Sequence, residues 1–423
     1  MHTYHTPLDL VRERSPERPV AFARPGVVAV AARWFQDNFQ GDVFYAVKAN
    51  PSPWVIETLA ANGVNSFDVA SIREIELVAQ FAPGARMAFM HPVKSRKAIS
   101  EAYHRFGVKT FALDTHEELA KILEATDGAP DLTLVVRLAV SAEGATYSLA
   151  GKFGVEGHEA PALLLAARRA TSGKLGVSFH VGSQCMRPTA YQAAMAQAQR
   201  AIVRAGVMVD IIDVGGGFPS VYPGMIPPDM ADYVDSIQRG FAEMSVHEET
   251  ELWCEPGRAL VAEASSILTK VELKKGDAVY LNDGSYGSLF DAAHMKWPFP
   301  VKLYRGEGAQ AHEVEGPLRP FRFYGPTCDS IDHMPGPFWL PEDIREGDYV
   351  EIGMLGAYGV AMKTNFNGFG DAEIVEVSDA PVASMFGLAG RVIRRPREEQ
   401  AEERKVVRLS RPKGAAGKKR RRR

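Results

Sequence analysis

Residues 43–50 read VFYAVKAN, a short apolar run that ends in a lysine and an asparagine. Seven further apolar runs follow within the first 260 residues, and a turn and a helix-like segment come after each. Eight strand–helix repeats of this kind are typical of a (β/α)8 barrel, with an open doubly wound sheet as the alternative. The predicted strands are Val43–Val47, Ser66–Ala70, Met87–Met90, Thr110–Leu113, Leu132–Ala139, Gly176–Phe179, Val209–Val214 and Leu252–Cys254.

Helical patterns separate these strands. The clearest are Trp54–Asn62, Ile72–Phe81 and Tyr191–Ala205. Ser71 followed by Glu74, and Thr115 followed by Glu118, have the spacing of capping boxes, in which each side chain bonds the backbone N–H of the other residue. These pairs therefore predict where two of the barrel helices begin.

The predicted strands share a feature at their carboxyl ends, where nearly every one is followed by an ionisable residue or glycines. These rim positions are Lys48, Asp68, His91, Asp114, Arg137, His180, Gly215–Gly217 and Glu255. Barrel enzymes build their active sites at this rim, so the set favours the barrel over the open sheet.

The pattern changes after residue 260, where strand-like runs follow one another without long helices between them. These runs are Ser266–Leu273, Ala278–Leu281, Asp348–Ile352 and Glu373–Val377. We therefore predict a barrel over 26–262, a β domain over 263–385, an N-terminal segment 1–25 that adds an edge strand to the β domain, and a tail over 386–423.

Charge is distributed unevenly along the chain. The formal net charge is -3, but residues 391–423 hold 15 Lys and Arg against four Glu. We expect this basic tail to be disordered and to contact polyanions at most, while the acidic remainder is no general nucleic-acid binder. No long apolar stretch predicts a membrane span or a signal peptide, so the expected compartment is the cytoplasm. The three cysteines lack CxxC spacing, so we expect no metal site.

Four segments carry residues suited to chemistry. Lys48 either reaches water along the strand or forms a Schiff base with an aldehyde through a lowered pKa. The run Gly215–Gly217 is either a tight turn or a cradle in which backbone N–H groups bind an anion. Glu255 and Arg258 either pair at the surface or bind opposite ends of a cofactor. His180 is either a core histidine or a ring stacked on a planar ligand.

Together, the segments YAVKAN, FDVAS, FHVGSQC, DVGGGFP, EPGR, YGPTCDSID, GAY and NFNGF resemble the fold type III pyridoxal-phosphate decarboxylases of the ornithine and diaminopimelate group. They span residues 43–369 in the order of that family. The resemblance implies an alanine-racemase-like barrel with a β domain. Alanine racemase itself places a tyrosine where GPTCDSID offers a thiol.

The resemblance also implies roles for individual residues. Lys48 would hold pyridoxal phosphate covalently, His180 would stack on its ring, and Glu255 would pair with the ring nitrogen. Asp68 and Arg137 would support the ring. The phosphate would be surrounded by Ser183, Gly215, Gly216, Gly217, Arg258 and Tyr358. Cys328 would act at the reacting carbon after carbon dioxide leaves, and Asp291 and Asp329 would bind the distal amine of the substrate.

The resemblance further implies a head-to-tail homodimer in which Cys328 and Asp329 complete the site of the other subunit. Two aspartates opposite the distal group favour L-ornithine, which would yield putrescine in polyamine biosynthesis. Lysine, or both amino acids, is the alternative, because one methylene discriminates weakly. Diaminopimelate carries a distal carboxylate that two aspartates would repel. A remoter alternative is an inactive regulatory homologue, although no cofactor-site residue is missing.

Overall fold

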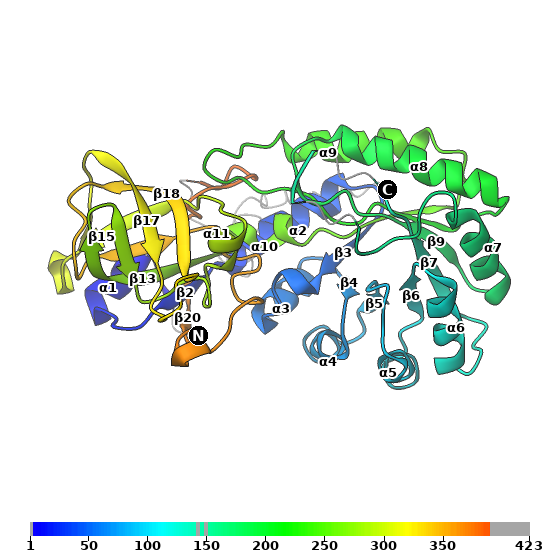
Figure 1. Ribbon diagram of the computed structural model, residues 1–423, viewed down its shortest axis with the longest axis horizontal. Helices are drawn as coiled ribbons and strands as arrows, with labels where there is room; N and C mark the ends of the chain where they lie inside the picture. The colour runs from blue at the N-terminus through cyan, green and yellow to red at the C-terminus, as the bar shows by residue number, and fades with distance from the viewer. Residues whose placement is uncertain (1–2, 141–143, 148–150, 390–423) are drawn as a thin grey trace, which may run out of the picture.

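The structure is a computed structural model that describes residues 3–140, 144–147 and 151–389. The predicted basic tail lies outside the described residues from position 390 onward. Figure 1 shows two parts side by side, a ring of helices around strands on the right and a strand-rich domain on the left. The predicted fold class, a (β/α)8 barrel with a second domain made mostly of strands, is confirmed.

Eight parallel strands close the barrel in the order β11-β12-β3-β4-β5-β6-β7-β9. Their bounds are β3 Asp42–Ala46, β4 Ser66–Val69, β5 Arg86–Phe89, β6 Thr110–Leu113, β7 Thr133–Arg137, β9 Leu175–Ser178, β11 Ile211–Asp213 and β12 Glu251–Cys254. Each lies where the sequence predicted a strand. The predicted runs Leu132–Ala139 and Val209–Val214 extend beyond β7 and β11, because apolar residues continue into the loops that enter and leave these strands.

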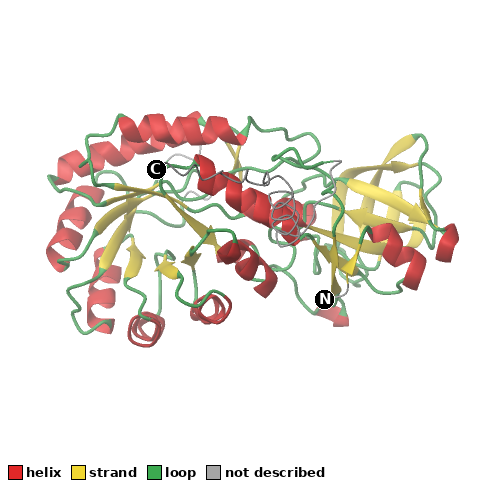
Figure 2. Ribbon diagram, turned by 180° about the vertical axis from the view of Figure 1, so that it is seen from behind, coloured by secondary structure: helices red, strands yellow, loops and turns green. Residues whose placement is uncertain are grey.

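Helices cover the outside of the barrel (Figure 2). They are α2 Pro25–Asn38, α3 Pro53–Ala61, α4 Ile72–Phe81, α5 Arg96–Phe106, α6 His116–Ala125, α7 Ala160–Ala170, α8 Thr189–Ala205 and α9 Met230–Ala242. The predicted helices correspond to α3, α4 and α8, and the bounds of α4 are the predicted ones.

The predicted capping boxes are only half formed. The hydroxyls of Ser71 and Thr115 accept from the N–H groups of Glu74 at 3.2 Å and Glu118 at 3.1 Å, as expected. The two carboxylates do not return the bond to the capping residue. Glu74 accepts instead from the N–H of Ala70 at 2.6 Å. Glu118 accepts from the N–H of Lys94, in the turn between β5 and α5. The prediction of complete boxes is therefore wrong, because Glu74 takes a donor beside its own cap and Glu118 takes a donor from a distant part of the chain.

The amino-terminal end of the barrel is plugged by aromatic side chains. The rings of Phe44 and Trp253 lie 4.5 Å apart between centroids, and both are buried. The guanidinium of Arg86 covers both rings at 4.5 and 4.6 Å and pairs with Asp42 at 2.8 Å. This end of the barrel is closed, so the carboxyl ends of the strands are left for a binding site.

The second domain is built on a sheet of ten strands. They are β1 Thr3–Tyr4, β2 Val20–Ala23, β13 Ser265–Lys275, β14 Ala278–Leu281, β15 Val301–Arg305, β16 His312–Glu313, β17 Leu318–Tyr324, β18 His333–Pro341, β19 Tyr349–Ile352 and β20 Glu373–Val377. The N-terminal segment supplies two of them. Strand β1 lies at the edge, but β2 pairs on both sides, with β13 and β20, and is an inner strand.

A buried arginine joins the start of the barrel to this sheet. Arg24 is only 2% exposed, and it donates to Glu351 at 3.0 Å and to Asp379 at 2.9 Å. Nearby, the N–H of Tyr358 donates to the carbonyl of Ala49 at 2.7 Å. The loop before Tyr358 is thereby fixed against the turn that follows β3. The Tyr358 side chain, which belongs to the β domain, therefore lies at the rim of the barrel.

Within the described part of the chain, no helix is both long and apolar enough to span a bilayer.

Candidate active site

A cavity of about 530 Å³ opens at the carboxyl ends of the barrel strands. It brings together most of the predicted cofactor residues. Those that line it are Lys48, Asp68, Arg137, His180, Ser183, Gly216, Gly217, Glu255, Arg258 and Tyr358. Gly215 lies directly before the glycines of the wall, although it is not itself part of the lining. The convergence follows from parallel pairing, which places all strand ends at one rim.

Lys48 lies in the single turn that follows β3, and its ammonium donates to Asp68 at 2.9 Å. The Asp68 carboxylate is buried at 2% exposure, whereas the lysine side chain is 45% exposed and lines the cavity. Burial lowers the pKa of Lys48, but the carboxylates of Asp68 and Glu255 outweigh burial and hold it above its ordinary value. The prediction of a lowered pKa is therefore wrong: the ammonium is held ionised beside its partner.

Glu255 lines the cavity and has an unpaired carboxylate oxygen. Its Oε1 atom is buried without a hydrogen-bond partner, as is Oδ2 of the neighbouring Asp213. Burial and Asp213 raise the pKa of Glu255 well above its usual range, and burial raises the pKa of Asp213 to about 6. Two adjacent acidic groups are costly to bury, and the charges of Lys48 and Arg137 offset only part of that cost. A protonated ring nitrogen is a group that would stabilise this pair.

His180 supplies a flat neutral ring. Its Nδ1 accepts from the N–H of Gly182 at 3.0 Å. Burial, with Arg137 and Lys48 nearby, lowers the pKa of His180 well below its ordinary value. A neutral imidazole fixed in this way can stack on an aromatic ligand without adding charge.

The glycine run leaves room for an anion. Gly215 and Gly217 have φ angles of 67° and 104°, which side-chain-bearing residues rarely adopt. A Cβ on Gly216 would lie 2.8 Å from the carbonyl oxygen of Glu255, and one on Gly217 would lie 2.6 Å from that of Gly182. Side chains are therefore excluded here, and the backbone of Gly216 and Gly217 itself forms part of the cavity wall, where N–H groups could bind a phosphate.

Arg258 lines the same cavity and lies inside an aromatic enclosure. Its guanidinium carbon is 4.7 Å from the Trp297 ring centroid and 4.9 Å from that of Tyr358. It also donates to the Tyr222 hydroxyl at 2.8 Å. The buried Nε atom has no partner. A fixed, buried cation with a spare N–H matches the needs of a phosphate ligand.

Asp291 was predicted to bind the substrate amine, but in this chain it bonds Arg258. Its Oδ2 lies 3.2 Å from both terminal nitrogens of the guanidinium, and the carboxylate is 12% exposed. Burial raises the pKa of Asp291, although Arg258 opposes that effect. The carboxylate therefore helps to fix Arg258. It could bind a substrate amine only while it also bonds Arg258.

Cys328 and Asp329 are not brought to the barrel cavity within one chain. They line a second cavity of about 620 Å³ on the β domain, with Phe369 and Tyr324 among its walls. The exposed Cys328 thiol lies 3.3 Å from Oδ1 of Asn367. Asp329 accepts from the Tyr286 hydroxyl at 2.6 Å. The predicted thiol and distal-amine group thus face outward.

Several wall residues were not predicted as cofactor contacts. They are Ala46, Ala70, Met90, His91, Pro92, Lys152, Phe153, Phe218 and Gly257. His91 was placed at the rim by its position after a strand, which is the signal that could have assigned it. Tyr222 and Trp297 offered no such signal, because they reach Arg258 from distant loops. No cluster of three or more potential metal ligands occurs among the residues with described positions.

The residues that line the barrel cavity fit pyridoxal phosphate. Glu255 and Arg258 line the cavity, and each has a buried polar atom without a partner that a ring nitrogen or a phosphate could engage. Gly216, Gly217, the neutral His180 ring and the Lys48 ammonium line the same cavity. A barrel with these groups at its rim defines a class of pyridoxal-phosphate enzymes.

Comparison with known proteins narrows this class. Residues 26–262 match the family model described as "Pyridoxal-dependent decarboxylase, pyridoxal binding domain". The chain therefore belongs to the pyridoxal-phosphate-dependent decarboxylases of fold type III. It is a carboxy-lyase that uses pyridoxal phosphate and acts on a basic amino acid.

Two relatives illustrate the range of the family. A lysine/ornithine decarboxylase of Selenomonas ruminantium is 33% identical over 347 residues, which cover 80% of this chain and 84% of the relative. Antizyme inhibitor 2 of Xenopus laevis is 33% identical over 352 residues, covering 77% of this chain and 73% of the relative.

Solved structures agree in fold. The arginine decarboxylase of Paramecium bursaria Chlorella virus bound to agmatine superimposes with a TM-score of 0.75 at 27% identity, covering 87% of this chain and 98% of that one. Lysine/ornithine decarboxylase from Vibrio vulnificus complexed with putrescine superimposes with a TM-score of 0.74 at 28% identity, covering 88% and 99%.

Proposed function

We propose that this enzyme decarboxylates L-ornithine to putrescine. The observation that supports this proposal most is the negative charge of Asp329 and of the cavity that it lines. This carboxylate is half-buried, and the Tyr286 hydroxyl that it accepts from lowers its pKa. It therefore remains ionised and can face an ammonium group. The cavity that it lines also contains Glu272 and Asp332, and no described lysine, arginine or histidine. An anionic wall of this kind attracts a diamine and repels the distal carboxylate of diaminopimelate.

The proposed site needs two subunits. Lys48 and Cys328 line separate cavities of one chain, so a second copy must present its Cys328 and Asp329 to the barrel rim of the first. We therefore propose a homodimer with two shared sites. The lysine/ornithine decarboxylase from Vibrio vulnificus, solved with putrescine and with cadaverine, supports a diamine product by similarity.

The residues of the chain divide the work in the proposed reaction. Bound pyridoxal phosphate supplies a conjugated ring that delocalises the electron pair left at Cα when carbon dioxide departs. Glu255 would hold a proton on the ring nitrogen, and His180 would stack on the ring. Arg258 and the glycine backbone would bind the phosphate. The Cys328 thiol of the second subunit donates the proton that Cα requires, because a thiol can give up a proton near neutral pH.

Lysine is the second candidate substrate, and dual specificity is a third. Lysine is longer by one methylene, which is worth only about 1–3 kcal/mol of discrimination. The relative from Selenomonas ruminantium is named for both amino acids. An inactive regulator is a fourth candidate, since one relative is named antizyme inhibitor 2. The intact set Lys48, Glu255, Arg258 and Cys328 supports an active enzyme instead.

The test measures carbon dioxide release from ornithine, lysine, arginine and diaminopimelate at equal enzyme concentration. We expect kcat/KM to be highest for ornithine, with lysine next and diaminopimelate negligible. A preference for diaminopimelate or arginine would overturn the substrate assignment while leaving the decarboxylase class intact. No turnover of any of the four by protein that binds pyridoxal phosphate would favour the regulator.

A further inference from the structure

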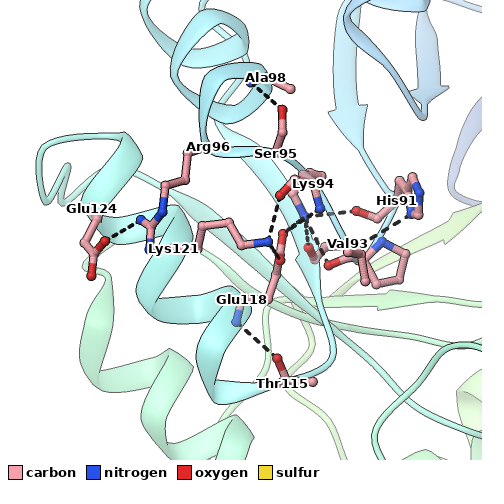
Figure 3. Close-up of polar contacts among 12 residues, drawn as sticks. His91, Val93, Lys94, Ser95, Arg96, Ala98, Thr115, Glu118, Lys121 and Glu124 are labelled. Atoms are coloured by element: carbon pink, nitrogen blue, oxygen red, sulfur yellow. Dashed lines mark hydrogen bonds and ion pairs between the residues drawn. The ribbon is translucent and has the colours of Figure 1, made fainter.

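The turn between β5 and α5 forms one wall of the cofactor cavity. Met90, His91 and Pro92 of this turn line the cavity directly. The turn belongs to neither the strand nor the helix, so backbone ladders do not hold all its carbonyl groups. Figure 3 shows that a lysine two residues further on, Lys94, folds back toward the turn.

The ammonium of Lys94 is fully engaged by protein acceptors. Its side chain is 0% exposed, and Nζ lies 2.9 Å from an oxygen of Glu118. Nζ also donates to the carbonyl of His91 at 2.9 Å and to that of Ala112 at 2.5 Å. An ammonium has three N–H donors, and three close acceptors are present. The lysine therefore ties the cavity wall to β6, the next strand of the barrel.

Glu118 completes the cluster from α6. Its Oε1 accepts from the backbone N–H of Lys94 at 3.1 Å, and its other oxygen bonds Lys121. Lys121 in turn donates to the backbone carbonyl of Lys94 at 2.7 Å. These bonds explain why Glu118 does not complete the predicted capping box: its carboxylate is turned toward the β5–α5 turn.

A second segment of the cavity wall, which contains Phe153, is also attached near the end of β6. Asp114, at the end of β6, accepts from the N–H of Gly154 at 2.9 Å. The adjacent Phe153 lines the cavity, and its ring meets that of His91 edge-on at 5.2 Å. Two wall segments thus contact each other, and both are tethered near the end of β6.

Stability alone is a weak reason for this arrangement. A buried ion pair often contributes no more than apolar residues of similar volume, because both charges lose their hydration. A lysine that bonds carbonyl groups of the wall does something that an apolar residue cannot do. It fixes the position of His91 and Pro92 relative to the ring that the cavity is shaped to hold.

We propose that Lys94 is a positioning residue of the decarboxylase, which sets the His91–Pro92 wall and through it the seating of pyridoxal phosphate. Lys94 does not itself line the cavity, so it acts through the wall. Glu118 neutralises its charge but bonds no carbonyl of the wall. The two residues of one ion pair are therefore expected to differ in their effect on the cofactor.

That difference provides the test. Lys94→Met removes the bonds to the wall and keeps a similar volume, whereas Glu118→Gln leaves the ammonium on the carbonyls of His91 and Ala112. The full-length chain is stripped of pyridoxal phosphate and then titrated with it, and the dissociation constant and the visible circular dichroism of the bound ring are measured. Melting temperatures without added cofactor and values of kcat and KM are recorded on the same preparations.

We expect both variants to melt below the wild type. Only Lys94→Met should weaken cofactor binding by tenfold or more, alter the circular dichroism of the bound ring and lower kcat. Equal cofactor binding and spectra in Lys94→Met and wild type would overturn the proposal. An equal loss of cofactor affinity in both variants would also overturn it, because the cluster would then act only through stability.

A double variant keeps the test decisive if the single variant folds poorly. Lys94→Met combined with Glu118→Leu removes both fully buried charges of the cluster and leaves only Lys121, whose side chain is 23% exposed and can reach water, so its melting temperature should exceed that of Lys94→Met. Weak cofactor binding should persist in this variant. If stability and cofactor affinity return together to wild-type values, Lys94 has no positioning role.

Discussion

Subunit mixing tests the proposed shared site most directly. Lys48 and Cys328 line different cavities of one chain, so we expect Lys48→Ala and Cys328→Ala each to be nearly inactive as a homodimer. After exchange of equal amounts, half the dimers contain one chain of each kind. In such a dimer one site has lost both residues and the other has lost neither. The mixture should therefore recover about a quarter of wild-type activity per mole of protein.

The assay follows carbon dioxide release from ornithine as a function of mixing time, with native mass spectrometry on tagged chains to establish that subunits have exchanged. If both residues of a site came from one chain, the mixture would show only the residual activity of the two variants. Complete exchange without recovery would refute the shared site.

A reciprocal mixture provides the control. The double variant Lys48→Ala with Cys328→Ala, exchanged with an equal amount of wild type, places one defect in each site of every mixed dimer. Only the wild-type homodimers remain active, so about a quarter of the activity of an all-wild-type sample should remain. Sites built within single chains would instead leave about half.

Three further predictions concern single residues. Asp329→Asn should lower kcat/KM for ornithine by about ten- to a hundredfold, the value of a charge-assisted hydrogen bond, and steady-state kinetics with unchanged cofactor binding would verify it. Gly217→Ala should weaken pyridoxal phosphate binding at least tenfold in a titration, because the new Cβ would meet the carbonyl oxygen of Gly182 at 2.6 Å. Burial raises the pKa of Glu263 from 4.5 to about 7. Between pH 4.5 and pH 7 the folded state therefore keeps a proton on Glu263 that the unfolded state has lost. The contribution of this group to the free energy of unfolding is complete below pH 4.5 and is lost as the pH rises through 7. Between pH 5 and 8 the melting temperature of Glu263→Gln should rise relative to wild type, by the equivalent of up to about 3 kcal/mol.

Each of these has an outcome that contradicts it. Unchanged ornithine kinetics in Asp329→Asn would remove the distal-amine role, and wild-type affinity in Gly217→Ala would show that the cradle tolerates a side chain. A melting difference that stays constant from pH 5 to pH 8 would show that Glu263 does not titrate in this range.

The barrel could be predicted from sequence because its signals are local. Strand positions follow from short apolar runs, and the period of α4 and its Ser71 cap are encoded within a dozen residues. Parallel pairing then places every strand end at one rim, so Lys48, His180 and Glu255 could be assigned to one cavity before their distances were known. The identity of the ring-binding and phosphate-binding groups needed the family resemblance in addition.

Other features depended on contacts between residues far apart in the chain. Asp291 bonds Arg258, and Glu118 bonds Lys94 instead of closing its own cap. No local pattern contains these choices, because a carboxylate takes whichever donor the packed structure brings nearest. The β domain gave a weaker signal for the same reason: β15 pairs with β19 and β17 pairs with β14, and these partners lie far apart in the chain.

The sequence by itself determined which chemical groups are present and the order in which they follow the strands. Tertiary structure decided their states. It set Lys48 beside Asp68, so that two carboxylates hold the pKa of the lysine up where burial alone would lower it. It also placed Cys328 on a face separate from the barrel cavity. Charge states and partners depend on distances of a few ångströms across the fold, and only the packed chain fixes such distances.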